Sequence, residues 1–420
     1  MNLTASLFSG MILLFLNGHG SENTDMHSDS GETLAKIIVH SGEYERFDTP
    51  LSFSLDAITH VYEKNLRLYE LTENIVVPVD VQFTGGNPRE MHWLLSGHTD
   101  RDTIRIYELR KEHTQSGSKR MKIERNPDNY VLYSGDKQVI QYNSGTMPAP
   151  QGANPVYRRS GFFHPLFSPN SAVLTNIQPP GHLHHYGIMN PWTRTTFRGE
   201  VVDFWNLAKE EGRVRFNGLA SANEGNVFAS LQVHHEHIAW PDTPKETIAM
   251  NELQEVKVFH QNDGSFLIEI NSRLNPTEKL ILEEYLYGGF LLRATDFWTH
   301  ENSRFFTSEG LNREEANEER ARWCVVSGDT PQGKAGILIM SHPSNYNHPE
   351  PVRVWNSDDT RPRDYFINFS PTMNMQWELE AGIDYTLRYR MLVFDGSIDK
   401  ERAALIWNDF ANPPQIIIDK

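Results

Sequence analysis

The sequence has a single cysteine, Cys324, among its 420 residues, so no disulfide can form within the chain. Because Cys324 lies between Trp323 and the apolar Val325, we expect a buried thiol rather than a nucleophile. Basic residues are also few: 39 Lys and Arg stand against 55 Asp and Glu, giving a net charge of −16. This balance excludes the basic footprint of a nucleic-acid-binding protein and disfavours adsorption to anionic membranes.

Apolar runs long enough to cross a bilayer are missing as well. The run LFSGMILLFL at residues 7–16 has the length of the apolar core of an export signal, and a polar, acidic stretch follows it. The sequence therefore predicts a signal peptide over 1–20 and a disordered segment over 21–30. We expect a periplasmic or secreted protein without a membrane span.

Several well-known catalytic and cofactor motifs are absent too. The chain contains no P-loop, no dinucleotide-binding fingerprint and no H-E-x-x-H motif. It also lacks the G-x-S-x-G elbow of serine acyl transferases. We expect no organic cofactor, and a divalent metal is the one cofactor left open.

Short strand-like segments make up most of the chain. Asn262-Asp263-Gly264 separates two apolar runs at 256–261 and 266–270, the pattern of a hairpin. From Tyr385 to Val393 apolar and polar residues alternate, which is typical of a strand with one buried face. We predict a mainly β protein, with a small N-terminal β domain at 31–113. A large antiparallel β-sandwich, supersandwich-like, should follow at 120–412.

One helix is predicted near the end of the chain, over residues 398–411. Ser397 is a suitable N-cap, and Asn412-Pro413-Pro414 is a stop signal. The apolar residues that form its i, i+3, i+4, i+7 stripe are Ala403, Ile406, Trp407 and Phe410. The helix should close the large sandwich.

The most informative segment is Pro179-Pro180-Gly181-His182-Leu183-His184-His185-Tyr186-Gly187, here called the histidine loop. The Pro-Pro-Gly and Gly brackets indicate a shaped loop, and imidazole suits both proton transfer near neutral pH and metal binding. If 182–185 were extended, His182 and His184 would share one face and His185 would point away. His182 and His184 are therefore the alternative metal pair.

Other segments carry further candidates. Glu284, Tyr285, Tyr287 and Arg293 surround a Gly-Gly pair that allows close approach to a ligand, although Glu284 and Arg293 could instead brace a sheet. His342 and Asn345 follow an apolar strand, where turn chemistry is the alternative. His164 precedes Pro165 in a loop, and Trp192 is an aromatic residue that could stack on a sugar.

The tract His234-His235-Glu236-His237 lies in a strand-like run. Alternation would place His235 and His237 on one face of the strand. We interpret this face as exposed, because a strand with one solvated face normally carries polar residues there.

The ordered set of these segments resembles the PmoA-type family of exported bacterial proteins, labelled "methane oxygenase PmoA". The resemblance covers roughly residues 155–412 and rests on segments 164–169, 181–187, 203–205, 287–293, 342–345 and 385–396. It implies a secreted β-sandwich protein of polysaccharide-degrading bacteria, some of whose relatives act as oligosaccharide dehydratases or lyases. Two positions depart from the family pattern, since Gly181 stands for an Asp and Tyr186 for an Arg.

Together these features predict a carbohydrate-active lyase or dehydratase that acts on an oligosaccharide or polysaccharide by proton abstraction and elimination. The catalytic candidates are His184, His185, Tyr285, Arg293 and His342. The substrate-binding candidates are His164, His182, Trp192, Glu284, Tyr287 and Asn345. A non-catalytic sugar-binding protein and a metal-dependent hydrolase or oxygenase are the alternatives.

Overall fold

The computed structural model describes residues 31–73, 75–113, 119–355 and 365–419; the predicted signal peptide and disordered segment lie outside these ranges. The fold is mainly β, with one helix near the C-terminus, α1 (Lys400–Ala411), as the sequence predicts. Three 3-10 turns are η1 (Glu63–Asn65), η2 (Pro155–Tyr157) and η3 (Leu207–Lys209). Within the described part of the chain, no helix is long and apolar enough to cross a membrane.

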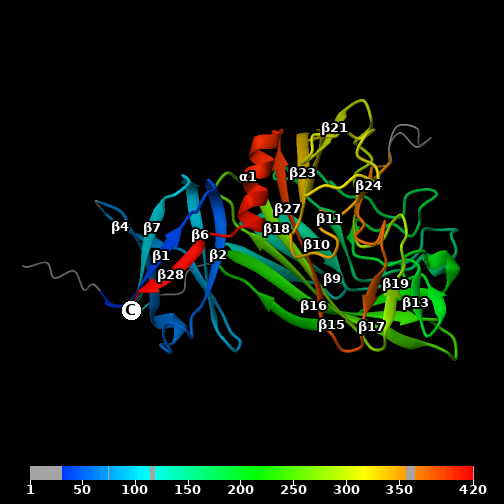
Figure 1. Cartoon of the computed structure of the whole chain (residues 1–420), viewed down its shortest axis with the longest axis horizontal. Helices are drawn as coiled ribbons and strands as arrows, with labels where there is room; N and C mark the ends of the chain where they lie inside the picture. Colours follow the sequence, from blue (N-terminus) through cyan, green and yellow to red (C-terminus); the bar gives the residue numbers. More distant parts are fainter. Residues whose placement is uncertain (1–30, 74, 114–118, 356–364, 420) are drawn as a thin grey trace, which may run out of the picture.

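Two eight-stranded antiparallel sheets form the large sandwich (Figure 1). The large sheet has the order β15 (Gly212–Asn223), β16 (Phe228–Ala239), β17 (Thr247–Phe259), β18 (Phe266–Pro276), β27 (Tyr385–Asp395), β23 (Gly333–Ser341), β22 (Trp323–Thr330) and β21 (Ser303–Thr307). The facing sheet has the order β24 (Val352–Val354), β25 (Phe366–Phe369), β20 (Phe290–Arg293), β12 (Ile188–Met189), β11 (Phe162–Leu166), β10 (Lys137–Asn143), β9 (Asn129–Ser134) and β8 (Met121–Arg125). A smaller sheet has the order β14 (Glu200–Val202), β13 (Thr195–Phe197), β19 (Leu280–Leu282) and β26 (Trp377–Leu379).

Two further sheets form the small N-terminal β region at one end of the molecule (Figure 1). One has the order β28 (Gln415–Asp419), β1 (Glu32–His40), β7 (Ile104–Lys111), β3 (Leu66–Leu71) and β4 (Val76–Val79). The other has the order β2 (Arg46–Ser54), β6 (Glu90–Thr99) and β5 (Val81–Thr84). In the five-stranded sheet, β28 follows α1 in the sequence and pairs with β1.

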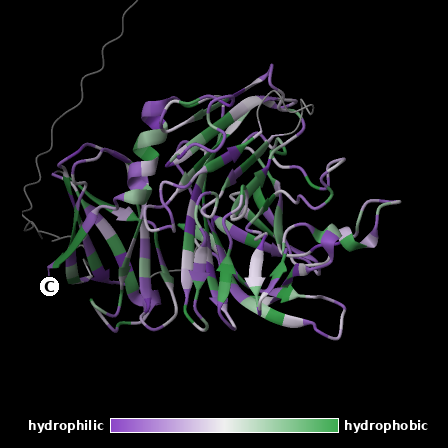
Figure 2. Ribbon diagram, turned by 45° about the vertical axis from the view of Figure 1, so that its right-hand side comes forward, coloured by the Kyte–Doolittle hydropathy of each residue, from purple (hydrophilic) through white to green (hydrophobic). Residues whose placement is uncertain are grey.

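The main core lies between the two eight-stranded sheets, because strand alternation directs one set of side chains inward. On β18 and β27, Ile268, Ile270, Leu387 and Tyr389 belong to this core. Figure 2 shows the matching alternation of hydrophobic and hydrophilic residues along the strands. The predicted hairpin is confirmed, with Phe259 opposite Leu267 across the β17–β18 turn. Cys324 is buried in the same core, and burial raises the pKa of its thiol.

The helix begins two residues later than predicted. Its N-cap is Asp399, whose side chain accepts a hydrogen bond from the Arg402 amide at 2.8 Å, and not Ser397. Asp and Ser are equally good N-caps, so the sequence could not choose between them. The apolar stripe is confirmed, since Ala403, Ile406, Trp407 and Phe410 are all buried.

A second prediction is wrong: the face of β16 that carries His235 and His237 is buried. His235 Nδ1 lies 3.2 Å and His237 Nε2 3.0 Å from Glu252 Oε2 on the neighbouring strand. Ser272 donates to the other oxygen of Glu252 at 2.5 Å, and the Tyr142 hydroxyl lies 2.6 Å from His235 Nε2. The imidazoles are tolerated on the inner face because each has a hydrogen-bond partner there.

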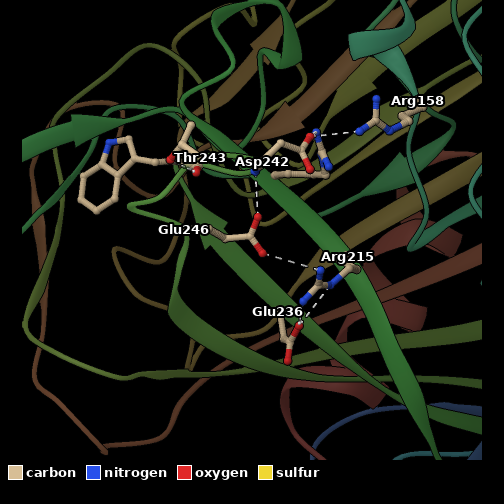
Figure 3. A network of polar contacts seen from close by, with 8 residues as sticks. Arg158, Arg215, Glu236, Asp242, Thr243 and Glu246 are labelled. Atoms are coloured by element: carbon tan, nitrogen blue, oxygen red, sulfur yellow. Dashed lines mark hydrogen bonds and ion pairs between the residues drawn. The ribbon is translucent and has the colours of Figure 1, made fainter.

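Glu236 points to the opposite face of the same strand, as alternation requires. It pairs with Arg215 on β15 at 2.7 Å, and Arg215 also approaches Glu246 (Figure 3). Asp242, in the turn after β16, pairs with both Arg158 and Arg213. This surface network fixes the β16–β17 turn against its neighbours.

We expect the Glu252→Ala variant to lose at least about 1–3 kcal/mol of unfolding free energy, because its removal leaves the buried side chains of His235, His237 and Ser272 without their shared hydrogen-bond acceptor. Burial alone would raise the pKa of Glu252, but the hydrogen bonds from His235 and His237 outweigh burial and lower it. Urea unfolding at neutral pH measures the loss. Glu278→Ala, which removes an exposed partner of Arg198, is the control and should change little. Equal stability of the two variants would contradict the anchoring role of Glu252.

Candidate active site: a pocket lined by histidine and tryptophan

The histidine loop is a tight turn and not an extended segment. The His182 amide donates to the Pro179 carbonyl at 2.9 Å, and the His185 amide donates to the His182 carbonyl at 2.9 Å. Gly187, which ends the loop, has φ of +51°, and a Cβ there would lie 2.2 Å from the Phe163 carbonyl oxygen. Glycine is therefore required where the loop enters β12.

This turn gathers all three imidazoles, so the extended arrangement in which His185 would point away does not occur. The ring centroids of His182 and His185 are 4.9 Å apart, and those of His184 and His185 are 4.6 Å apart. His182 and His184 are 5.9 Å apart. In a turn, unlike in a strand, neighbouring side chains need not alternate between faces.

The three histidines line a cavity of about 260 Å³ on the outer face of the facing sheet, here called the histidine pocket. Its other lining residues are Trp205, Asn206, Tyr287, Arg353, Trp355 and Phe366. Its place on the outer face follows from alternation: Leu291 and Phe366 pack in a satellite cluster with Trp205, whereas Leu292 and Ile367 belong to the main core.

Asp203 positions two of the lining residues. Its Oδ1 accepts hydrogen bonds from the amides of Trp205 and Asn206, both at 2.9 Å. Its Oδ2 accepts from Thr193 at 3.0 Å and pairs with Lys209 at 2.9 Å. The Asp-Phe-Trp segment therefore places the Trp205 indole in the pocket, 4.9 Å from the Tyr287 ring.

Burial shifts the pKa values of two residues that line the pocket. Burial, with a smaller contribution from His182, lowers the pKa of His184 to about 4. Burial also raises the pKa of Tyr287, with a further contribution from its contact with Tyr285. Near neutral pH the pocket thus holds a neutral imidazole at His184 and a protonated phenol at Tyr287.

Arg353 is the cation that lines the pocket. Its guanidinium lies 5.9 Å from the centre of the Tyr287 ring, and no acidic partner for it is found among the described residues. The predicted Arg293 lies below the pocket, fully buried, with its guanidinium 5.4 Å from the centre of the Trp355 ring. The alternation of β24 explains the orientation of Arg353, because Val352 and Val354 enter the core and the residue between them faces outward.

Of the predicted site residues, His182, His184, His185 and Tyr287 line the pocket. Tyr285 contacts Tyr287, with ring centroids 4.8 Å apart. Glu284 is exposed and does not line the pocket, nor is it paired with Arg293 in any contact found. Trp192 is buried in the core, where it cannot stack on a substrate, and His164 bonds Thr175 at 2.9 Å behind the loop.

The candidates His342 and Asn345 do not reach the histidine pocket. His342 lines a different cavity, on the outer face of the large sheet, and stacks edge-on against Phe410. Asn345 donates to the Arg388 carbonyl at 2.9 Å and accepts from its amide at 2.8 Å. It therefore fixes the turn after β23 and is buried away from the histidine pocket.

Sequence reasoning missed Arg353, Trp355 and Phe366. The alternating Val352-Arg353-Val354-Trp355 run was the available signal, since a short strand of this pattern directs Arg353 and Trp355 away from the core. Among the described residues, no group of three or more His, Cys, Asp or Glu side chains is arranged to hold a metal ion.

The fold and pocket define a β-sandwich protein with an aromatic-lined cavity. The model of DUF6807, a family of unknown function, matches residues 129–408, and the chain belongs to this family. No curated protein matches it.

Several solved structures share its fold only loosely. A glycosyl hydrolase family 38 protein from Enterococcus faecalis has 8% identity and a TM-score of 0.47, covering 93% of this chain and 49% of its own. A galactose mutarotase-like protein from Lactobacillus casei has 8% identity and a TM-score of 0.33, covering 65% and 99%. Heparan sulfate lyase HepC from Pedobacter heparinus has 11% identity and a TM-score of 0.30, covering 69% and 38%. The chain spans about half the length of the first of these, and likenesses this low carry no argument about its substrate.

Asn345 also donates a hydrogen bond to Glu350, a buried carboxyl whose ionisation should affect the stability of the fold. This carboxyl accepts hydrogen bonds from Ser341 at 2.6 Å, Asn345 at 2.8 Å and Tyr389 at 2.8 Å. Burial is the dominant influence and raises its pKa from 4.5 to about 7. The folded state therefore binds a proton more tightly than the unfolded state, so this group destabilises the fold as pH rises from about 4.5 through about 7.

We expect Glu350→Gln to remove this dependence. Relative to the wild type, the variant should gain up to about 3 kcal/mol of unfolding free energy between pH 4 and pH 8, since each pKa unit corresponds to about 1.4 kcal/mol. Urea unfolding of both proteins at the two pH values gives the difference. A constant difference between them would show that Glu350 does not titrate in this range.

Proposed function

We propose that the histidine pocket binds a uronate unit of an oligosaccharide and catalyses β-elimination. The base removes the proton on the carbon next to the carboxylate, and the electron pair forms a carbon–carbon double bond. The bond to the leaving oxygen on the adjacent carbon breaks, and that oxygen takes a proton. No oxidant or second substrate is needed.

The observation that carries the proposal is the meeting of three complementary groups in one pocket. His184 is neutral near pH 7 and can act as the base. Arg353 can pair with the uronate carboxylate and offset the charge that develops as the proton leaves. Tyr287 keeps its proton and can donate it to the leaving oxygen.

The aromatic walls favour a saccharide as the ligand. Trp205, Trp355 and Phe366 supply apolar faces, and Asn206 a polar group beside them. Binding pockets for small molecules commonly combine such apolar walls with a few placed polar groups. His182 with His184 as a metal pair remains the alternative, and metal analysis of the purified protein tests it.

We expect His184→Ala, Tyr287→Phe and Arg353→Gln each to lower kcat by about 100-fold or more, the range for loss of a general acid or base. Elimination creates a conjugated double bond, so absorbance in the near ultraviolet follows turnover on a panel of uronate oligosaccharides. Glu284→Gln, an exposed neighbour outside the pocket, should retain wild-type activity. The proposal fails if no member of the panel gives an absorbance gain with the wild type.

The pH dependence of activity distinguishes the buried His184 from an imidazole with the unperturbed pKa of about 6.5. His184 must be neutral to act, so kcat/KM should fall only as pH drops toward about 4. The bound carboxylate would raise the pKa of His184, so the acidic limb of kcat should lie at higher pH than that of kcat/KM. Steady-state kinetics with circular dichroism controls at each pH give both limbs. Joint loss of activity and of a stoichiometric metal would favour the metal alternative.

A further inference from the structure

A second cavity, of about 630 Å³, lies on the opposite outer face of the sandwich. Residues of β16, β17, β18 and β27 on the outward face of the large sheet line it, together with residues of β2 and β6 of the N-terminal region. His342, Phe410 and Pro413 close one end. We call it the sheet groove. Ligand sites occur preferentially where two structural units meet in this way.

Strand register arranges the floor in rows of polar side chains. Gln232, Glu255, Asn271 and Arg388 are successive cross-strand partners in one row. Lys257, Glu269 and Arg390 form the next row. The first row thus reads amide, carboxylate, amide and cation, and in the second row a carboxylate lies between two cations. Paired residues in antiparallel sheets lie about 5 Å apart.

The charge of the groove is opposite to that of the whole protein. It is lined by four basic residues, Lys257, Arg273, Arg388 and Arg390, and by two acidic ones, Glu255 and Glu269. The chain as a whole carries a net charge of −16. A local excess of cations in an acidic protein concentrates anions at that surface.

Both acidic residues already have partners within the sheet. Glu255 accepts hydrogen bonds from Gln232 and from Asn271, each at 3.2 Å. Glu269 accepts from Arg390 Nε at 3.1 Å. They are therefore oriented by the sheet. Lys257 also pairs with Glu255 at 3.8 Å, and Arg273 pairs with Asp384 at 3.4 Å, so Arg388 is the groove cation for which the described residues supply no carboxylate partner.

Two arginines of the groove can still donate hydrogen bonds to a ligand. Arg390 is only 6% exposed, and its Nη1 is buried with no hydrogen-bond partner among the described residues. Arg388 is exposed, and none of the described carboxylates forms an ion pair with it. A buried donor without an acceptor is costly, so an acceptor supplied by a ligand would be bound favourably.

We propose that the sheet groove is a second binding site, for an oligosaccharide that carries carboxylate or sulfate groups. Arg388 and Arg390 pair with the anionic groups, and Gln232 and Asn271 bind neighbouring hydroxyls. The volume favours a ligand of several rings over a single small anion, since pockets for such ligands span about 300–1000 Å³. This site is independent of the chemistry at the histidine pocket.

Isothermal titration calorimetry on the full chain tests the proposal. The probes are uronate oligosaccharides, sulfated oligosaccharides, neutral oligosaccharides of equal length and inorganic sulfate. The measurements are made in the wild type and in the Arg353→Gln background, which weakens binding at the histidine pocket. Arg388→Gln and Lys257→Gln remove charge from the groove, and Arg304→Gln is the matched control, because Arg304 is an exposed arginine of the same sheet outside the groove.

In the Arg353→Gln background we expect one class of acidic oligosaccharide to bind and neutral ones to bind weakly. Arg388→Gln should weaken the acidic ligand about tenfold or more, as loss of a charged hydrogen bond does, and Lys257→Gln should weaken it to a smaller extent. Arg304→Gln should leave it unchanged. Binding unaffected by Arg388→Gln and Lys257→Gln, or no binding by any acidic probe, would overturn the proposal. Equal affinity for inorganic sulfate would overturn the saccharide assignment.

Discussion

The packing of the large sheet against the facing sheet is the constraint on which the other features depend. Each strand of the two sheets directs every second side chain inward, where these side chains build the core. The remaining side chains are then directed to one of two outer faces. On β27, Leu387 and Tyr389 are in the core, and Arg388 faces the sheet groove. On β24, Val352 and Val354 are in the core, and Arg353 faces the histidine pocket.

This constraint also explains why the two sites differ in character. The facing sheet is covered on its outer side by long connections, including the histidine loop, so its pocket is narrow and aromatic. On the outer face of the large sheet, β2, β6 and α1 contribute residues to the sheet groove, and the central strands present polar side chains there. Burial lowers the pKa of imidazoles in both environments, His184 in the first and His92 and His342 in the second. The two sites differ instead in their lining, which is aromatic with one cation, Arg353, in the first and includes four cations in the second.

Much of the fold could be predicted from local patterns. The hairpin at 259–267 and the alternation of β27 depend on residues close in sequence, and so does the buried stripe of α1. Features that depend on distant partners could not be predicted. The tract at 234–237 looks like an exposed polar face until Glu252 and Tyr142 are known to meet His235. The histidine loop could be identified because its pattern is local. The sequence could not show that His342 lies on the other side of the sandwich, or that Arg353 and not Arg293 lines the pocket, because these positions depend on distant partners.

The pairing of β28 with β1 joins the two ends of the described chain in one sheet. Ile416 and Ile418 of β28 pack against the core of the N-terminal region, and Arg46 of β2 pairs with Asp409 of α1 at 3.1 Å. The edge of β1 that faces away from β7 is therefore unpaired until β28 has been synthesised. Synthesis proceeds from the N-terminus at about 5–20 residues per second, so the N-terminal sheet can be completed only after the sandwich has emerged. Strand β1 precedes the sandwich in the sequence, yet it obtains its second neighbour only from a strand that follows the sandwich.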